Sequence, residues 1–162
     1  MNTPAEIRPF QSDEDARWAA SVMAGSEPWI TLGRGYEASH ALLSDPSKER
    51  FLAFVGSERA GFLILAMAGT FSGYVQTVCV AAEFRGCGLG TSLMEFAEKR
   101  VFRDSPNIFL CVSSFNGGAR RLYERLGYTP VGLLDDYLVA GHAEILMRKT
   151  IGPLDSFASR SR

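Results

Sequence analysis

The chain has 162 residues, a length that suits one domain and leaves little room for two. With 46% hydrophobic and 22% charged residues, it has the composition of an ordinary soluble globular protein. Its 17 lysines and arginines against 18 aspartates and glutamates give a formal net charge of −1. This balance provides no bulk attraction to nucleic acid or to an anionic membrane, so neither is expected as a partner.

The cysteines and histidines are too few and too scattered to predict a metal site. They are Cys79, Cys87, Cys111, His40 and His142. The odd cysteine count, without a C-x-x-C pair, favours a reducing cytosol. The N-terminal segment MNTPAEIRPF lacks the pattern of a signal peptide, and the longest apolar run, 60–69, is too short to span a bilayer as a helix. A cytoplasmic protein without a metal is therefore expected.

The first third of the chain predicts a short strand at 6–10 and two helices. The first helix covers 13–24, with Ser12 as a plausible N-cap, and the second covers 36–43. Between them, 25–35 holds a proline and two glycines, which is typical of a loop or a broken helix.

The middle of the chain changes to strands. Apolar runs at 50–55 and 60–68, separated by the turn 56–59, predict a hairpin, and 74–80 is a third run rich in valine and threonine. We expect these three strands to form an antiparallel meander.

After Gly90 the apolar period becomes helical, and a strand is expected at 108–112. Asn116 can cap a further helix that ends at Gly127. Strands at 128–134 and 144–149 follow, and the order becomes β-α-α-β-β-β-α-β-α-β-β. This order predicts a mixed sheet with helices on its faces.

The predicted elements also suggest the domain boundaries. We expect a single domain over 1–151. Residues 152–162 carry Pro153 and mostly small or polar side chains, so they are expected to form a loosely held tail.

Three alternating glycines lie between a strand and a helix, at Gly86, Gly88 and Gly90. Glycines allow a tight turn and let a ligand approach without Cβ clashes. The amides of such a loop converge, and the following helix adds the positive end of its dipole. Together with the charge of Arg85, the loop predicts a phosphate or pyrophosphate ligand; the alternative is a tight connection without a ligand.

Two other phosphate-binding motifs do not fit the loop. A P-loop needs a lysine before its Ser or Thr, whereas Gly90 is followed by Thr91 and Ser92. A dinucleotide fingerprint that begins at Gly86 would need glycine at position 91. A nucleotide-binding protein of another class is therefore disfavoured.

Two blocks of the sequence resemble the GNAT family of acetyl-CoA-dependent N-acetyltransferases. The first is Val78-Cys79-Val80 followed by Arg85-Gly86-Cys87-Gly88-Leu89-Gly90, and the second holds Asn116, Ala119 and Leu122 to Tyr128. The resemblance covers Arg50 to Lys149 and is weakest in the N-terminal helical segment. It implies an α/β (α+β) fold with a mixed, mostly antiparallel central sheet and helices on both faces. It also implies direct acetyl transfer from acetyl-CoA to a primary amine of a small molecule or peptide.

The resemblance assigns a set of residues to the donor acetyl-CoA: Val78, Cys79, Val80, Arg85, Gly86, Cys87, Gly88, Leu89, Gly90, Thr91, Asn116 and Tyr123. The pantetheine arm would pair with the edge of the strand over Val78 to Val80, and the acetyl group would lie where this strand splays from Ile108 to Ser114. A backbone N–H near Cys79 or Val80 would polarise the thioester carbonyl.

Tyr123 matches the general acid of the family, although it lies on the apolar stripe of its helix and could be a core residue. A tyrosine pKa of about 10 against about 8.5 for a thiol makes full proton transfer uphill by roughly 2 kcal/mol. Hydrogen bonding to the leaving sulfur is then the better description. Cys87 is interpreted as a spacer, and Cys79 and Cys111 as small core residues.

The general base is where the sequence departs from the family, because the strand Tyr74 to Val78 holds no carboxylate. An α-amine with a pKa near 8 is about 10% neutral at pH 7, and a lysine amine about 0.04%. The missing carboxylate favours an α-amine or a water-relayed base. The candidates by composition are Glu37, His40, Asp135, Asp136 and His142.

Three aromatic residues lie in or beside loops that would flank the acceptor channel: Trp29, Tyr36 and Tyr137. They could line the substrate pocket or serve ordinary packing. A homodimer is compatible with the resemblance, because many such domains pair through sheet edges or helices. The alternative function is a non-catalytic module on the same fold that binds or senses acyl-CoA.

Overall fold

A computed structural model describes residues 4–160 of the chain. Its strands follow the order β1-β2-β3-β4-β5-β7-β6 in a seven-stranded mixed sheet, as expected. The contacts divide the chain into two compact units, and each is described by itself. The first unit comprises Met1–Leu65 and Thr77–Phe96, and the second comprises Ala66–Gln76 and Ala97–Arg162.

The first unit contains the N-terminal strands and helices together with the segment around the glycine loop. Its elements are β1 (Glu6–Pro9), α1 (Asp13–Ala24), α2 (Tyr36–Leu43), β2 (Glu49–Val55), β3 (Glu58–Ala66), the end of β4 (Tyr74–Val80), the 3₁₀ turn η1 (Ala82–Phe84) and the start of α3 (Leu89–Val101).

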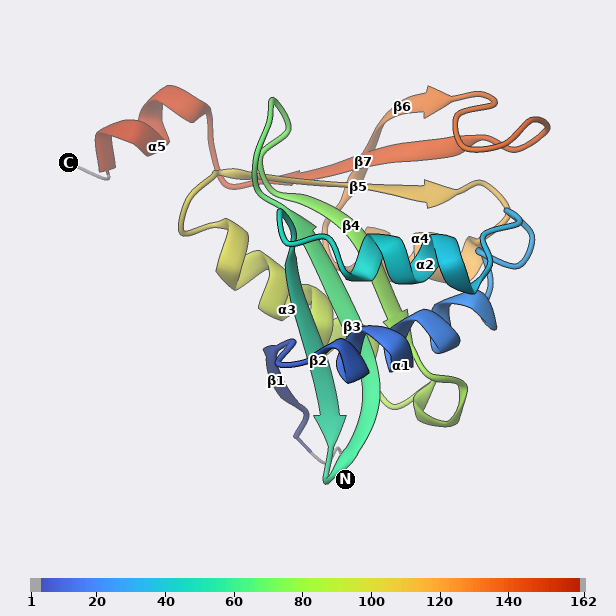
Figure 1. Cartoon of the computed structure of the whole chain (residues 1–162). Coiled ribbons are helices and arrows are strands. Elements are labelled where there is room, and N and C mark those ends of the chain that lie inside the picture. The colour runs from blue at the N-terminus through green and yellow to red at the C-terminus, as the bar shows by residue number, and fades with distance from the viewer. Residues whose placement is uncertain (1–3, 161–162) are drawn as a thin grey trace. The chain divides into compact units, whose positions relative to one another are not determined.

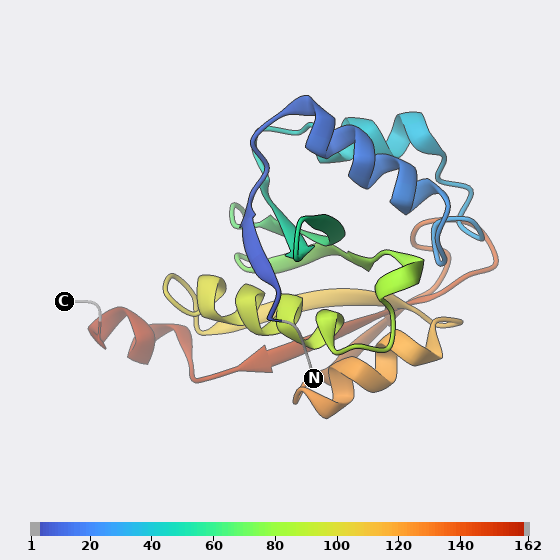
Figure 2. The same ribbon diagram turned by 90° about the horizontal axis from the view of Figure 1, so that it is seen from below.

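In the first unit, helices cover both faces of the β2–β3 hairpin. On one face, α1 and α2 lie side by side (Figure 1), and alanines of α1 form a core with Phe62 and Ile64 of β3. On the other face, a Cβ at Gly61 would lie 3.2 Å from Leu93 of α3. Figure 2 shows α1 and α2 above these strands and the start of α3 below them. The alternation of side chains along β3 thus supplies one apolar face to each helix layer.

The β2–β3 turn is tighter than the sequence predicts. Gly56 has φ of +62°, which glycine adopts without steric cost. A turn of Gly56 and Ser57 alone therefore suffices, and Glu58 and Arg59 pair with Val55 and Phe54 instead of lying in the turn.

The second unit contains the C-terminal strands and the helix that Asn116 was expected to cap. Its elements are the start of β4, the end of α3, β5 (Asn107–Ser113), α4 (Gly117–Arg125), β6 (Thr129–Leu134), β7 (Glu144–Thr150) and α5 (Leu154–Arg160). Strand β7 lies between β5 and β6 and is antiparallel to both (Figure 1). The start of β4 runs parallel to β5, with Tyr74 opposite Phe109.

The sequence predicts most element boundaries to within two residues. Helix α5 and the short turn η1 were not predicted. Helix α5 lies inside the segment 152–162, whose expected loose attachment stays a prediction, as does the single domain over 1–151. Residues 161 and 162 lie outside the described part of the chain.

Candidate functional site

The glycine loop joins β4 to α3 through η1 in the first unit. Gly86 and Gly88 have φ of +77° and +85°, so both occupy the left-handed region that favours glycine. Among the described residues, no heavy atom outside its chain neighbours lies within 4 Å of where a Gly86 Cβ would be. The backbone at Gly86 is therefore open to a ligand.

The loop leads directly into the amide end of α3. The Gly88 carbonyl accepts a hydrogen bond from the Ser92 amide at 3.1 Å, which makes it the first carbonyl of the helix ladder. The amides at the start of a helix have no partner within the helix. They lie beside the positive end of the dipole, and Gly90 and Thr91 lie in this first turn. This arrangement suits an anion such as a pyrophosphate.

Side-chain hydrogen bonds fix the loop within the first unit. Arg85 donates from Nε to the Val80 carbonyl at 3.2 Å and from Nη2 to Ser26 Oγ at 3.4 Å, and the side chain remains exposed. Cys87 Sγ donates to the Phe84 carbonyl at 2.6 Å. The guanidinium of Arg85 is thus fixed at the entrance of the loop, where its charge adds to that of the helix terminus.

Cys79 is a buried core residue. It belongs to the cluster formed with α1, and burial raises the pKa of its thiol to about 11. A thiol with this pKa stays protonated at neutral pH and is a poor nucleophile. The interpretation of Cys79 as a small core side chain is confirmed.

The second sequence block forms α4 in the second unit. Asn116 Oδ1 accepts a hydrogen bond from the Ala119 amide at 3.3 Å, which confirms the predicted N-cap. Tyr123 is 7% exposed, and its ring lies edge-on to Tyr128 at 6.0 Å between centroids. Lys149, whose Nζ lies 6.0 Å from the centre of the Tyr128 ring, pairs with Glu98 at 2.9 Å. This packing restricts the Tyr123 ring, whose roles in catalysis and donor binding stay predictions.

The three expected acceptor aromatics differ in environment. Trp29 packs against the α1 core, Tyr36 stacks on His40 with centroids 5.8 Å apart, and Tyr137 is 58% exposed. A role of any of them in acceptor binding stays a prediction.

The candidate bases are scattered over the molecule. His40 contacts Asp13 at 3.0 Å, and Asp136 Oδ1 accepts a bond from the Gly141 amide at 2.7 Å. Glu37 and Asp135 are exposed. The contact of His40 is with a residue of α1 and that of Asp136 is within its own loop, and neither involves a ligand.

Sequence reasoning missed Glu144, the first residue of β7. It is 4% exposed, and among the described residues its Oε2 atom has no hydrogen-bond partner. Burial raises the pKa of its carboxyl, an effect that Ser113 and His142 oppose. The Ser113 hydroxyl lies close enough to act on the carboxyl, but its Oγ makes no well-formed hydrogen bond. The signal available in the sequence was a carboxylate directly before the apolar run Ile145 to Met147.

In the part of the chain that the structure describes, no group of three or more His, Cys, Asp or Glu side chains is arranged to hold a metal ion. None of the helices there has the length and apolar character needed to cross a membrane.

The strand–loop–helix geometry is typical of proteins that bind an anionic ligand at the start of a helix. The model of the acetyltransferase (GNAT) family matches residues 13–128, and the chain belongs to this family. The resemblance seen in the sequence is confirmed.

Individual relatives agree with this assignment. An uncharacterised N-acetyltransferase of Methanocaldococcus jannaschii is 33% identical over 101 residues, which cover 61% of this chain and 64% of that protein. An N-alpha-acetyltransferase of Sulfurisphaera tokodaii is 29% identical over 111 residues, which cover 60% and 66%. The match therefore spans slightly less than two thirds of these curated relatives.

A solved structure extends the likeness to nearly the whole chain. The aminoglycoside 6'-N-acetyltransferase complexed with coenzyme A matches with a TM-score of 0.74 at 19% identity. It covers 91% of this chain and 98% of that protein. At this identity the likeness supports the fold alone, and it confirms the expected fold class.

Proposed function

We propose that the protein is an N-acetyltransferase that transfers the acetyl group of acetyl-CoA directly to a primary amine of a small molecule or peptide. The observation that carries the proposal is the open glycine loop, with Gly86 and Gly88 at positive φ and Arg85 fixed at its entrance. Membership in the acetyltransferase family supports it. We place the protein in the cytoplasm as part of the same proposal.

The loop and the first turn of α3 bind the pyrophosphate of acetyl-CoA in this proposal. Backbone amides from Gly86 to Thr91 face the phosphates, and the exposed Arg85 guanidinium adds charge. The strand segment Val78 to Val80 binds the pantetheine arm through its main chain, with one amide near Cys79 or Val80 directed at the thioester carbonyl. Cys87 and Leu89 act here through their backbone.

Tyr123 and Asn116 act on the sulfur end of acetyl-CoA in this proposal. The amine attacks the thioester carbonyl carbon, the C–N bond forms, and the C–S bond breaks. The Tyr123 hydroxyl hydrogen-bonds the departing thiolate. Asn116 uses one lone pair of its side-chain oxygen for the cap, and its amide nitrogen remains a donor for the pantetheine arm.

The acceptor is proposed only as a class. A curated relative and the solved structure differ in this respect, because the first is described as an N-alpha-acetyltransferase and the second as an aminoglycoside 6'-N-acetyltransferase. Trp29, Tyr36 and Tyr137 are proposed to line the acceptor channel.

The experiment is a thiol-release assay with acetyl-CoA and a panel of primary amines. The panel holds an alanyl peptide with a free N-terminus, Nα-acetyl-lysine, butylamine and an aminoglycoside. We expect CoA thiol to appear only when an accepted amine is present. Tight acetyl-CoA binding without amine-dependent thiol release would contradict the proposal and favour a non-catalytic module. Thermal protection by ATP or NAD, but not by CoA, would point to another nucleotide-binding class.

A further inference from the structure

Glu144 is a buried acidic residue that no lysine or arginine among the described side chains pairs with. It is 4% exposed and lies directly opposite Ser113 in the β5–β7 pair. Among the side chains that the structure describes, no lysine or arginine pairs with it, and its Oε2 atom is enclosed and unpartnered. Burying such a group is unfavourable unless a cation or a hydrogen-bond donor compensates it. The folded protein therefore keeps an acidic group that no described lysine or arginine neutralises. His142, when protonated, compensates it in part.

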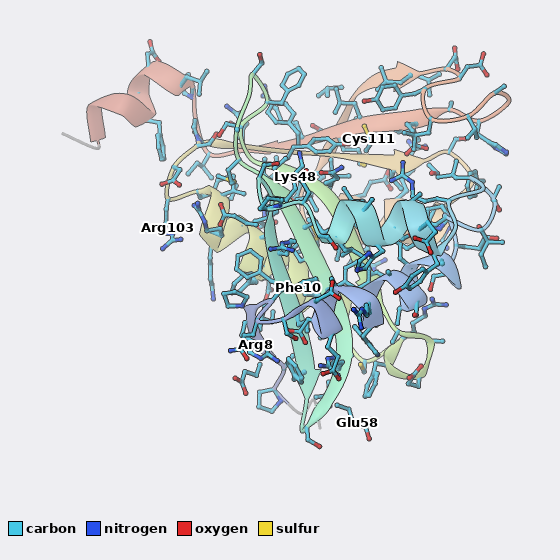
Figure 3. All side chains as sticks on the ribbon, in the orientation of Figure 1. Arg8, Phe10, Lys48, Glu58, Arg103 and Cys111 are labelled. Atoms are coloured by element: carbon cyan, nitrogen blue, oxygen red, sulfur yellow. The ribbon has the colours of Figure 1, made fainter. Side chains whose placement is uncertain are left out.

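Titratable side chains of the second unit interact electrostatically with Glu144 or with its neighbours. The charge of Glu144 contributes to raising the pKa of Tyr74 on β4, after burial, the Cys111 thiol and Tyr137. Cys111 lies on β5 (Figure 3), and its own pKa is raised first by burial and then by Glu144. His142, just before β7, lowers the pKa of Glu144. The other groups are hydroxyls and a thiol, so a protonated His142 is the one among them whose charge favours the carboxylate.

Glu144 and Tyr123 belong to opposite faces of the sheet in the second unit. Glu144 shares its face with Ser113, its partner in the ladder, because paired residues point to the same side. Lys149, five residues later, points to the other side, where it reaches Glu98 of α3 and lies 6.0 Å from the Tyr128 ring. Tyr123 contacts Tyr128 there. An acyl group held at this sheet would have Tyr123 on one side and Glu144 on the other.

We propose that Glu144 binds the acceptor as a protonated primary amine and takes its proton. The inference rests on the proposed function and deepens it. Glu144 supplies from β7 the carboxylate that β4 lacks, and the missing cation of the buried site is the ammonium group of the substrate.

The proton and the bonds balance in this step. The acceptor enters as R–NH₃⁺ and transfers one proton to the Glu144 carboxylate, which leaves a neutral amine. The amine nitrogen attacks the thioester carbon, the C–N bond forms, the C–S bond breaks, and the CoA thiolate leaves towards Tyr123. The remaining surplus proton on nitrogen neutralises the thiolate, and Glu144 releases its proton to solvent.

Strongly basic alkylamines are the acceptor class whose acetylation should be accelerated most by Glu144. An amine with a pKa of about 10.4 is about 0.04% neutral at pH 7, whereas an α-amine near pKa 8 is about 10% neutral. A buried carboxylate removes this limitation for the alkylamine. Glu144 thus offsets the preference for α-amines that the carboxylate-free strand β4 suggested.

The experiment compares the wild type with Glu144→Gln, Glu144→Asp and Glu58→Gln. Glu58 is an exposed carboxylate at the start of β3 (Figure 3) and provides the matched control. Steady-state kcat/KM is measured from pH 6.5 to 10 with Nα-acetyl-lysine and the alanyl peptide at saturating acetyl-CoA. We expect E144Q to lower kcat/KM at pH 7.5 by about 100-fold or more for the more basic amine. The loss should shrink towards pH 10, where the amine is neutral without help.

The other variants sharpen the result. E144D keeps the carboxylate and should retain more activity than E144Q, and E58Q should stay within about two-fold of the wild type. The KM for acetyl-CoA should change little in E144Q. A kcat/KM of E144Q within three-fold of the wild type at pH 7.5 would overturn the inference. A loss that is equal at all pH values, or equal in E144D and E144Q, would show a structural role and overturn it as well. If the wild type releases no thiol with any amine, the proposed function itself fails.

Discussion

Asp15 is a buried residue that connects three elements of the first unit through hydrogen bonds. Its side chain is 1% exposed, and Oδ1 accepts from Arg59 Nη2 at 2.9 Å while Oδ2 accepts from the Gln11 amide at 2.9 Å. Arg8 adds a contact at 3.3 Å. The carboxylate therefore joins β1, α1 and β3 at one point.

Replacing Asp15 by asparagine should destabilise the protein. The change removes charge-assisted hydrogen bonds that each contribute about 1.5 to 3 kcal/mol, and we expect a net loss of about 2 to 3 kcal/mol. Urea unfolding measures it. The control is Asp13→Asn, whose carboxylate is about half exposed in the ion pair with Arg17 and should lose less than about 1 kcal/mol. An equal loss in the two variants would contradict this account of Asp15.

The contribution of Asp15 to the free energy of unfolding should decrease in acid. Burial alone would raise the pKa of Asp15, but hydrogen bonds from Gln11, Arg59 and Arg8 outweigh it and hold the pKa below its usual value of 3.8. Because the folded state binds the proton less tightly than the unfolded state, the stabilisation is complete above that pH and is lost as the pH falls through the folded pKa. The stability gap between wild type and D15N should therefore narrow below about pH 4. A gap that widens in acid would contradict the assignment.

Tyr123 is the residue on which the proposed leaving-group chemistry depends. Tyr123→Phe removes only the hydroxyl, and we expect kcat to fall by about 100-fold with little change in acetyl-CoA affinity. Turnover and calorimetric binding measure the two effects. Tyr128→Phe is the matched control, because it removes the hydroxyl of the neighbouring buried ring; its kcat should stay within a few-fold of the wild type. Full activity of Y123F would mean that Tyr123 is a core residue only.

At the scale of elements, the glycine loop between β4 and α3 allows a direct test of the proposed acetyl-CoA site. Gly86→Ala and Gly56→Ala both place a Cβ at positive φ, at +77° and +62°, in open space. Each should lose about 1 to 2 kcal/mol of stability from the left-handed backbone. Only G86A places its methyl group where the pyrophosphate is proposed to bind, so only G86A should weaken acetyl-CoA binding, by about ten-fold or more. Equal affinities of the two variants for acetyl-CoA would exclude Gly86 from the donor site.

The elements were largely predictable because local signals and burial agree. Helix α1 was expected as a helical stretch that follows Ser12, and α4 follows from the Asn116 cap and from Gly127, whose φ is +95°. The turn at Gly56 was harder, because a four-residue and a two-residue connection fit the same sequence. Helix α5 was missed because its apolar residues are few and Pro153 precedes it.

Contacts between distant segments could not be predicted from the sequence. Arg59 lies 44 positions from Asp15, and no local pattern relates the two. The same holds for Glu144, whose importance appears only when burial and the absence of a pairing cation among the described side chains are known. The proposed donor site was accessible from the sequence because its glycines follow one another along the chain. The residues proposed for the acceptor come from separate segments.

At the scale of the whole molecule, the proposed function is the transfer of an acetyl group from acetyl-CoA to a primary amine. In this proposal, G86A should impair the reaction through acetyl-CoA affinity and Y123F through turnover.

The most direct measurement uses acetyl-CoA with an isotope-labelled acetyl group and the best amine of the panel. Mass spectrometry follows the labelled amine while a thiol reagent follows CoA. The account predicts one labelled amide for each CoA thiol released, and no thiol release without the amine. Thiol release that is unaffected by the amine, with the label recovered as free acetate, would contradict it.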